Sequence, residues 1–188
     1  KIWWICPRVQ VCLGLFEELK KEHYLPKSRI EIFTGDYKET AVNGAVTETD
    51  QTAYFSGDII ITTIDQAVNA VISHGKVTAL IELMNAHVVF DEFHELVSMP
   101  AFNLLFSELI ECKAMRGTNA DTLLISATPN YFFLEQVLGI KIQEECVRVP
   151  STNSSIYDIQ FDVFADEFGQ NSALNQPQRD NTFVITNT

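Results

Sequence analysis

Short apolar runs recur along the chain, and the segments between them carry apolar residues at helical spacing. Four of these runs are nearly continuous in Ile, Val and Leu, a pattern typical of strands that are buried on both faces of a parallel sheet. They cover residues 2–6, 58–63, 87–91 and 122–126. A fifth run, residues 29–33, alternates more and is expected nearer an edge of the sheet.

Helical periodicity is clearest directly after the first strand, where one stripe is apolar and the opposite face is charged. The stripe consists of Val9, Cys12, Phe16 and Leu19. Similar patterns predict helices over residues 64–72, 78–84, 102–115 and 131–138, the last closed by Gly139 as a C-cap. Strands that alternate with helices predict an α/β fold, with a parallel sheet covered by helices on both faces.

Two segments interrupt this alternation. Residues 36–57 are rich in Thr, Gly, Asn and acidic side chains and are interpreted as a surface loop or flexible insertion. The alternation of apolar runs and helical patterns ends again after Pro150. We therefore expect one domain over residues 1–150, a connector over 151–181, and the first strand of a second domain over 182–188.

Composition narrows the function classes. With 188 residues, 46% of them hydrophobic, the chain is long enough to bury a core, and no apolar run approaches the length of about 20 residues that crosses a bilayer. We expect a cytoplasmic protein without a membrane partner. The formal net charge of −12 argues against a broad electrostatic footprint on DNA or RNA, so any nucleic-acid contact must be local.

Cysteine and histidine spacing gives no sign of a metal centre. The four cysteines form no C-x-x-C pair, and the four histidines are scattered. Buried free thiols are the expected state of the cysteines.

Two adjacent carboxylates, Asp91 and Glu92, follow the apolar run at residues 87–91. Ligands of open α/β sheets bind at the carboxyl ends of the strands, where this pair is expected to lie. Asp91 can then hold a Mg²⁺ ion, and Glu92 can orient and deprotonate a water that attacks a phosphate. A strand that ends in a solvated acidic turn is the plainer interpretation.

The second candidate segment is Ser126, Ala127 and Thr128, which follow the last apolar run of the expected domain. Such hydroxyls can hydrogen-bond the carboxylates of a neighbouring strand and report the state of a bound nucleotide. Taken alone, the same residues form a good helix N-terminus, with Thr128 as the N-cap and Pro129 at the first helical position.

In this order the two segments resemble the superfamily of DExH helicases, in which an Asp-Glu-x-His box precedes a Ser-Ala-Thr box. The first box here is Asp91 to His94. Three upstream segments resemble the motifs with which that superfamily binds a nucleic-acid strand, here called strand-binding motifs. Their candidate nucleic-acid-binding residues are Pro7, Arg8, Gly35, Thr62 and Thr63. The resemblance implies a RecA-like motor domain that uses ATP and Mg²⁺, with Asp91, Glu92 and His94 as catalytic residues and Ser126, Ala127 and Thr128 as coupling residues.

A finer resemblance rests on the Thr-Ile-Asp-Gln sequence that begins at Thr63. It is similar to the CRISPR-associated helicase-nuclease of type I interference systems, which joins a nuclease domain to two RecA-like domains. That resemblance implies single-stranded DNA as the substrate, a guide-RNA surveillance complex as a partner, and a role in antiviral defence.

One departure limits what the chain can do alone. A helicase motor needs a G-x-x-x-x-G-K-[ST] loop to cradle the phosphates, and the only Gly-Lys pair, at Gly75, has neither the required glycine before it nor a hydroxyl after it. In the family that loop lies upstream of the Pro7 motif, so the chain is expected to begin after it and to be inactive by itself.

Several alternatives stay open. A DExH RNA helicase or another DNA translocase would carry the same motifs. A module that keeps the fold but binds a partner protein without hydrolysing ATP is a different class. A receiver-like or metabolic α/β domain would leave both boxes as coincidence.

Overall fold

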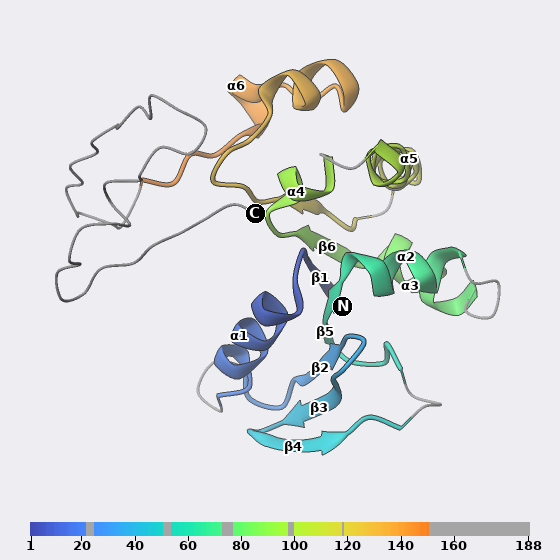
Figure 1. Cartoon of the computed structure of the whole chain (residues 1–188), viewed down its shortest axis with the longest axis vertical. Helices are drawn as coiled ribbons and strands as arrows, with labels where there is room; N and C mark the ends of the chain where they lie inside the picture. Colours follow the sequence, from blue (N-terminus) through green and yellow to red (C-terminus); the bar gives the residue numbers. More distant parts are fainter. Residues whose placement is uncertain (22–24, 51–53, 73–76, 98–99, 118, 151–188) are drawn as a thin grey trace, which may run out of the picture. The chain divides into compact units, whose positions relative to one another are not determined.

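Seven strands form one mixed sheet in the order β4-β3-β2-β5-β1-β6-β7 (Figure 1). The computed structural model describes residues 1–150 apart from 22–24, 51–53, 73–76, 98–99 and 118, and residues 1–146 form one unit. The expected connector (151–181) and the strand beyond it (182–188) lie outside the described residues.

Five of the strands are parallel to one another and correspond to the five predicted apolar runs. They are β1 (Ile2–Cys6), β2 (Arg29–Phe33), β5 (Ile59–Thr63), β6 (His87–Phe90) and β7 (Thr122–Leu124). The prediction of an α/β fold with a parallel set of strands is therefore confirmed, although the whole sheet is mixed.

The segment over residues 36–57, which was expected to be a loop, instead contains an antiparallel hairpin. Its strands are β3 (Lys38–Val42) and β4 (Ala45–Glu48), and β3 also pairs with β2. The turn is Asn43-Gly44, and both residues have positive φ angles, 49° and 78°. This is the conformation of a two-residue type I′ turn, for which Asn-Gly is the preferred sequence. The loop prediction was wrong because the Asn-Gly turn signal is short and the flanking strands are polar in composition.

The hairpin also changes the position of β2. The expectation that residues 29–33 lie near an edge is wrong, because β2 has β3 on one side and β5 on the other. Its alternation reflects one buried acidic residue, Glu31. The Glu31 carboxylate accepts hydrogen bonds from the backbone N–H groups of Phe55 (2.6 Å) and Gly57 (2.9 Å). These two bonds satisfy the buried carboxylate and hold the chain as it enters β5.

The longer helices agree with the predicted ones to within two residues at each end. They are α1 (Val9–Leu19), α2 (Ile64–Ile72), α3 (Val77–Asn85) and α5 (Pro100–Met115). The predicted helix over residues 131–138 contains a π-helical turn, η3 (Phe133–Val137), and Gly139 follows it with a φ angle of 67°, as a C-cap requires. Two short helices were not predicted, namely α4 (Phe93–Val97) and α6 (Ile142–Glu145).

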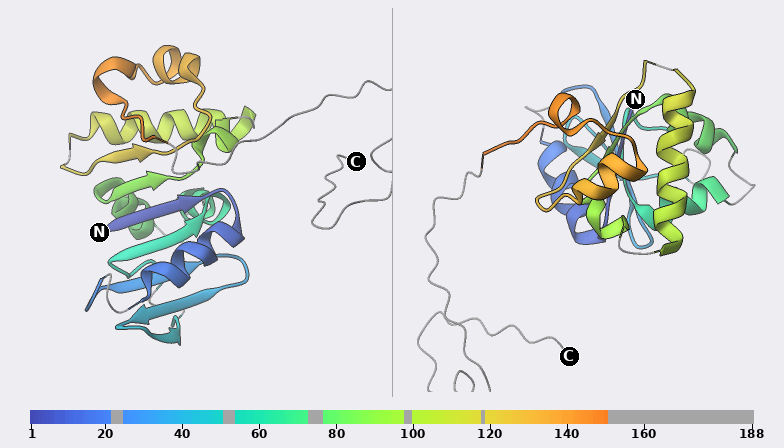
Figure 2. Two further views of the ribbon diagram at one scale, coloured as in Figure 1. Left: turned by 90° about the vertical axis from the view of Figure 1, so that its left-hand side faces the viewer. Right: turned by 90° about the horizontal axis from the view of Figure 1, so that it is seen from above.

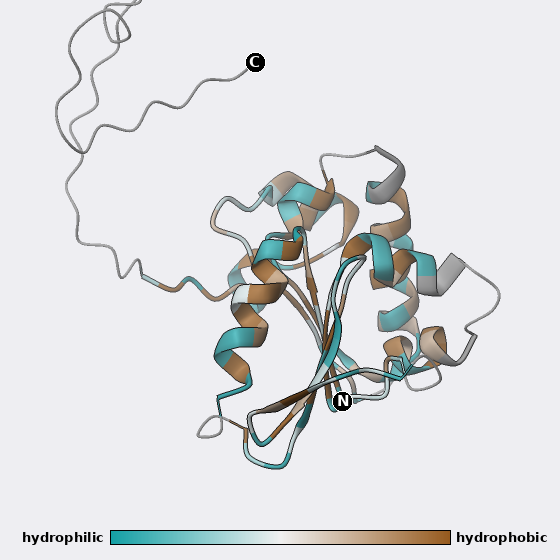
Figure 3. Cartoon of the chain, turned by 60° about the horizontal axis from the view of Figure 1, so that its bottom comes forward, coloured by the Kyte–Doolittle hydropathy of each residue, from teal (hydrophilic) through white to brown (hydrophobic). Residues whose placement is uncertain are grey.

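Helices cover both faces of the sheet, and each face has its own apolar core. On one face α1 packs Cys12 and Phe16 against Ile32 and Ile61 of the strands. On the other face a larger cluster joins the sheet to α2, α3, α4 and α5. Figure 2 gives two further views of this layering, and Figure 3 colours the strands between the layers mostly as hydrophobic. The prediction of helices on both faces is confirmed.

The two adjacent tryptophans illustrate how a strand serves both cores. Trp3 belongs to the larger cluster and stacks on Phe55 with ring centroids 4.9 Å apart, whereas Trp4 packs against the α1 cluster. Successive side chains of a strand point to opposite faces. Core packing therefore accounts for both residues, and Trp3 is buried too deeply to offer a base-stacking surface.

All four cysteines are free thiols, as expected, but the expectation that they are buried holds only for Cys6 and Cys12, because Cys112 is exposed and Cys146 is half-buried. A hydrogen bond shared with the neighbouring Cys12 thiol, followed by burial, raises the pKa of Cys6 above its usual range. In the part of the chain that the structure describes, none of the helices is both long and apolar enough to span a membrane.

Candidate functional site

Because the five parallel strands run in the same direction, their carboxyl ends meet at one edge of the sheet. Pro7 and Arg8 follow β1, Gly35 follows β2, and Asp91 follows β6. Ser126 lies just beyond β7. The predicted nucleic-acid-binding segments lie at the carboxyl ends of β2, β5 and β1, which are neighbours in the sheet. The Asp-Glu-x-His and Ser-Ala-Thr boxes follow β6 and β7, which are the next two strands. The edge is therefore divided into two adjoining halves.

Backbone hydrogen bonds continue past the ends of the strands and fix the carboxylate segment. The Asp91 N–H donates to the Ile5 carbonyl of β1 at 2.9 Å. On the other side the Ile125 N–H donates to the Phe90 carbonyl at 2.9 Å, and the Phe93 N–H donates to the Ile125 carbonyl at 3.1 Å. Asp91 and Glu92 are consequently held between two neighbouring strands rather than on a free loop.

Glu92 has an unusual backbone conformation for a residue with a side chain. Its φ angle is 47°, in the left-handed region that residues other than glycine occupy at a cost. Its Oε2 atom lies 3.4 Å from the Ala127 amide nitrogen, which donates to it, and 3.2 Å from His94 Nδ1. A strained residue held by contacts from two segments is typical of functional sites.

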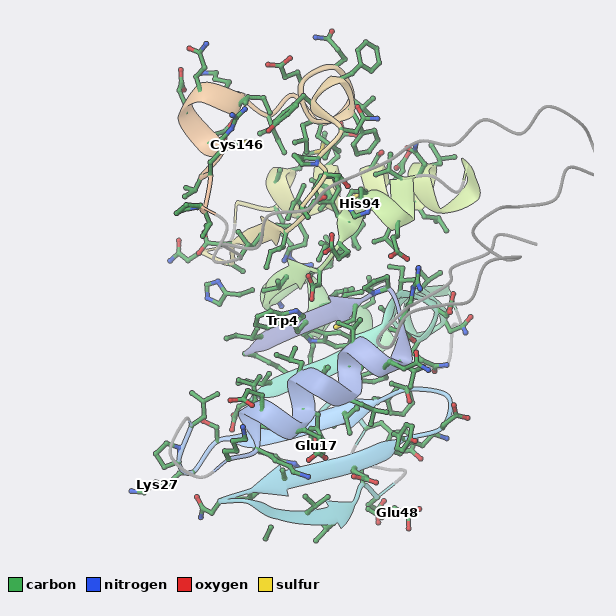
Figure 4. The ribbon with its side chains drawn as sticks, turned by 60° about the vertical axis from the view of Figure 1, so that its left-hand side comes forward. Trp4, Glu17, Lys27, Glu48, His94 and Cys146 are labelled. Carbon is green, nitrogen blue, oxygen red and sulfur yellow. The ribbon has the colours of Figure 1, made fainter. Side chains whose placement is uncertain are left out.

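His94 links the carboxylate box to the hydroxyl box. Its Nδ1 atom lies 2.8 Å from Ser126 Oγ, and the Thr128 N–H donates to the same oxygen at 3.0 Å. Figure 4 labels His94 on α4, the helix that follows β6. The structure thus joins Glu92, His94, Ser126, Ala127 and Thr128 in one network of close polar contacts. The bonds differ from the expected ones, because the Ser126 hydroxyl pairs with His94 and not with a carboxylate, and Glu92 accepts from the backbone N–H of Ala127.

Asp91 and Glu92 fit a particular kind of metal. Among the described residues no group of three or more His, Cys, Asp or Glu side chains could hold an ion. Mg²⁺ is commonly bound by only one or two carboxylates together with phosphate oxygens and water. Both carboxylates are partly exposed. These two carboxylates do not make a protein-enclosed metal cage, and a Mg²⁺ ion that they held would need further ligands, such as phosphate oxygens or water.

Arg8 makes a contact that the sequence did not predict. Its Nη2 atom lies 3.2 Å from both carboxylate oxygens of Glu95, and its Nε atom lies 3.3 Å from Oε2. Arg8 occupies the N-cap position of α1, and Glu95 lies on α4. This ion pair crosses the boundary between the two halves of the edge. No local pattern in the sequence indicates this contact, since the residues are 87 positions apart.

The structure does not bring the other strand-binding candidates into this network. Thr62 and Thr63 are buried, and the Thr62 hydroxyl donates to the Phe33 carbonyl at 2.6 Å. Both side chains are buried, and the Thr62 hydroxyl is bonded within the sheet, so the prediction that they bind nucleic acid gains no support from their positions.

Gly35 is exposed and lines a shallow hollow beside the β3–β4 hairpin. Three acidic side chains line the same hollow, namely Asp36, Glu39 and Glu48, against one lysine, Lys38. Their charge disfavours a phosphate backbone there. Arg8 is thus the strand-binding candidate with the most suitable setting.

Together the fold and the site define an α/β protein with a carboxylate–histidine–hydroxyl network at the carboxyl edge of its parallel strands. Comparison of the sequence with protein-family models gave no match, and comparison with curated proteins gave no significant match.

Proposed function

We propose that this chain is part of the first RecA-like motor domain of a DExH-type helicase that couples Mg²⁺-dependent ATP hydrolysis to movement along single-stranded DNA. The observation that carries the proposal is the bond between His94 Nδ1 and Ser126 Oγ at 2.8 Å. It joins the two boxes whose order in the sequence first suggested a helicase, and a motor needs such a connection between its nucleotide site and its moving parts.

Each residue of the network has a role in this proposal. Asp91 holds the Mg²⁺ that neutralises charge on the phosphates, and Glu92 positions the attacking water and accepts its proton. Ser126 and Thr128 sense the state of Glu92 through His94 and the Ala127 amide. Arg8 and the adjacent Pro7 segment bind the single-stranded DNA.

The unpaired edge of the sheet supports the proposal of a phosphate-binding loop contributed by another part of the intact protein. Within the described residues, β7 pairs with β6 only. Neighbouring strands lie about 4.8 Å apart, so a strand added beside β7 would end about 10 Å from β6, and one added beside β4 about 29 Å away. Of the two edges of the sheet, a strand added beside β7 would therefore bring such a loop much nearer to Asp91. Leu123 of β7 is 54% exposed, as expected of a surface that a further segment would cover.

The test is ATP turnover by the intact parent protein with Mg²⁺ and single-stranded DNA. Asp91→Asn and Glu92→Gln should each reduce the rate constant by at least about a hundredfold, the scale of general-base and charge-stabilising contributions. Glu111→Gln on the exposed part of α5 removes the same charge away from the site and should leave the rate unchanged. Turnover that survives in both site variants would contradict the proposal and favour a partner-binding module.

The narrower proposal is that the parent is a CRISPR helicase-nuclease acting with a guide-RNA complex. It predicts a phosphate-binding loop and a His-Asp nuclease cluster in the upstream part of the gene. A phosphate-binding loop without a nuclease cluster would instead favour a DExH RNA helicase or another DNA translocase.

A further inference from the structure

The Arg8–Glu95 ion pair has the geometry of an occupied phosphate site. The Arg8 guanidinium offers two nitrogens to one carboxylate, at 3.2 and 3.3 Å from Oε2, and its Nη2 also reaches Oε1 at 3.2 Å. A guanidinium fork recognises phosphate oxygens in the same way that it recognises a carboxylate. Glu95 therefore makes with Arg8 the kind of contact that phosphate oxygens make with a guanidinium group.

The pair is placed where displacement is easy. The Arg8 side chain is 67% exposed and the Glu95 side chain 32% exposed. Ion pairs in such positions are weak, since water and salt screen them. A phosphate can compete for Arg8 without first opening a buried contact.

Glu95 is also connected to the half of the edge that carries Asp91, Glu92 and Ser126. It directly follows His94 on α4, and the two flanking apolar residues, Phe93 and Leu96, are buried. The Glu95 N–H donates to the Glu92 carbonyl at 2.9 Å. A change in the position of Glu95 therefore acts on a short, anchored helix that also carries the His94–Ser126 bond.

From these contacts we infer that Glu95 occupies the phosphate site of Arg8 in the absence of nucleic acid, and that a bound strand displaces it and thereby acts on α4 and His94. Glu95 is then a positioning residue that sets the affinity for the strand and the nucleic-acid dependence of ATP turnover. This inference rests on the proposed function. It adds to that function a side chain of the protein, Glu95, that competes with the DNA phosphate for Arg8.

The experiment measures binding of a fluorescent oligodeoxythymidine to the intact parent protein by anisotropy, with a double-mutant cycle. Glu95→Gln should tighten binding about two- to fivefold, the factor expected for the loss of one exposed ion pair. Glu111→Gln is the matched control for net charge and should change affinity by less. Arg8→Gln should weaken binding and reduce the dependence of log K on log salt by about 0.7, the value for one lost phosphate contact.

The decisive comparison is Glu95→Gln in the Arg8→Gln background. We expect no tightening there, because the competitor has lost its target. The DNA concentration that gives half-maximal ATP turnover should fall in Glu95→Gln and stay unchanged in Glu111→Gln. A structural role for Glu95 would not produce this pattern.

Two results would overturn the inference. The first is that Glu95→Gln raises the affinity for the oligodeoxythymidine by the same factor with and without Arg8. The net charge alone would then set the affinity and the inference would fail, but the proposed motor function would stand. A wild-type parent that binds no single strand and hydrolyses no ATP would instead remove the proposed function, and this inference with it.

Discussion

At the scale of single residues, the backbone of Glu92 is the most informative feature of the site. Its φ angle of 47° lies in a region that costs an L-residue about 1 kcal/mol or more. Glycine would occupy the same position without that cost. A glutamate stands there instead, and its Oε2 atom lies 3.4 Å from the Ala127 amide nitrogen and 3.2 Å from His94 Nδ1.

A pair of substitutions separates the backbone from the side chain. Glu92→Gly and Glu92→Ala both remove the carboxylate, but only glycine relieves the left-handed conformation. Urea unfolding of the chain should therefore find Glu92→Gly more stable than Glu92→Ala by about 1 kcal/mol. Equal stabilities would mean that this conformation is not strained.

Lys113 provides a pH-dependent test of the fold away from the site. Its buried Nζ donates to the carbonyls of Leu83, Met84 and Ala86, at the end of α3 (3.3, 3.4 and 2.8 Å). Burial lowers its pKa, and the charge of Arg116 acts in the same direction. The native state thus holds this proton less tightly than the unfolded chain does, so stability should rise as the pH increases from the lowered pKa towards the ordinary value of 10.5.

The measurement is urea unfolding at neutral and alkaline pH for wild type and Lys113→Met, which keeps an unbranched side chain as far as Cε and removes the ammonium group. The stability of wild type relative to the variant should increase with pH. A difference that stays constant or falls would contradict the lowered pKa of Lys113.

At the scale of elements, β7 is the least protected strand of the parallel set. Only three residues long, it pairs on one side within the described residues, and it exposes Leu123. Unpaired strand edges with apolar side chains promote association. The nearby helices also expose Leu104, Met115 and Phe132.

We therefore expect the isolated chain to self-associate as its concentration rises, and Leu123→Lys to reduce that association. Sedimentation velocity across a concentration series would measure it. The exposed Val46 on the opposite edge strand, β4, supplies the matched control, and Val46→Lys should have a smaller effect. An equal effect of the two variants would show that β7 is not the main contact.

The elements also show what the sequence could and could not reveal. The five parallel strands and four longer helices were predictable because burial on both faces leaves continuous apolar runs, and burial on one face leaves a helical stripe. The hairpin at Asn43 and Gly44 had a local signal that was outweighed by composition. The order of the strands, and hence the position of β2 inside the sheet, depends on pairing between distant segments and leaves no local trace.

At the scale of the whole molecule, the net charge of −12 and the local contact at Arg8 fit together. An acidic protein can bind a strand only where a few basic groups are held in place. Of the site, the carboxylate and hydroxyl boxes were predictable from their order, and the structure joins them. The Arg8–Glu95 pair could not be predicted from the sequence, because it forms only when α1 and α4 meet at the edge of the sheet.

The most direct test of the account is the rate of ATP hydrolysis by the intact parent protein, measured alone, with single-stranded DNA and with single-stranded RNA. The account predicts that DNA raises the rate more than RNA does and that Glu92→Gln abolishes it under every condition. A rate that no nucleic acid changes, or one that Glu92→Gln leaves intact, would contradict the claim that this edge of the sheet is a motor site.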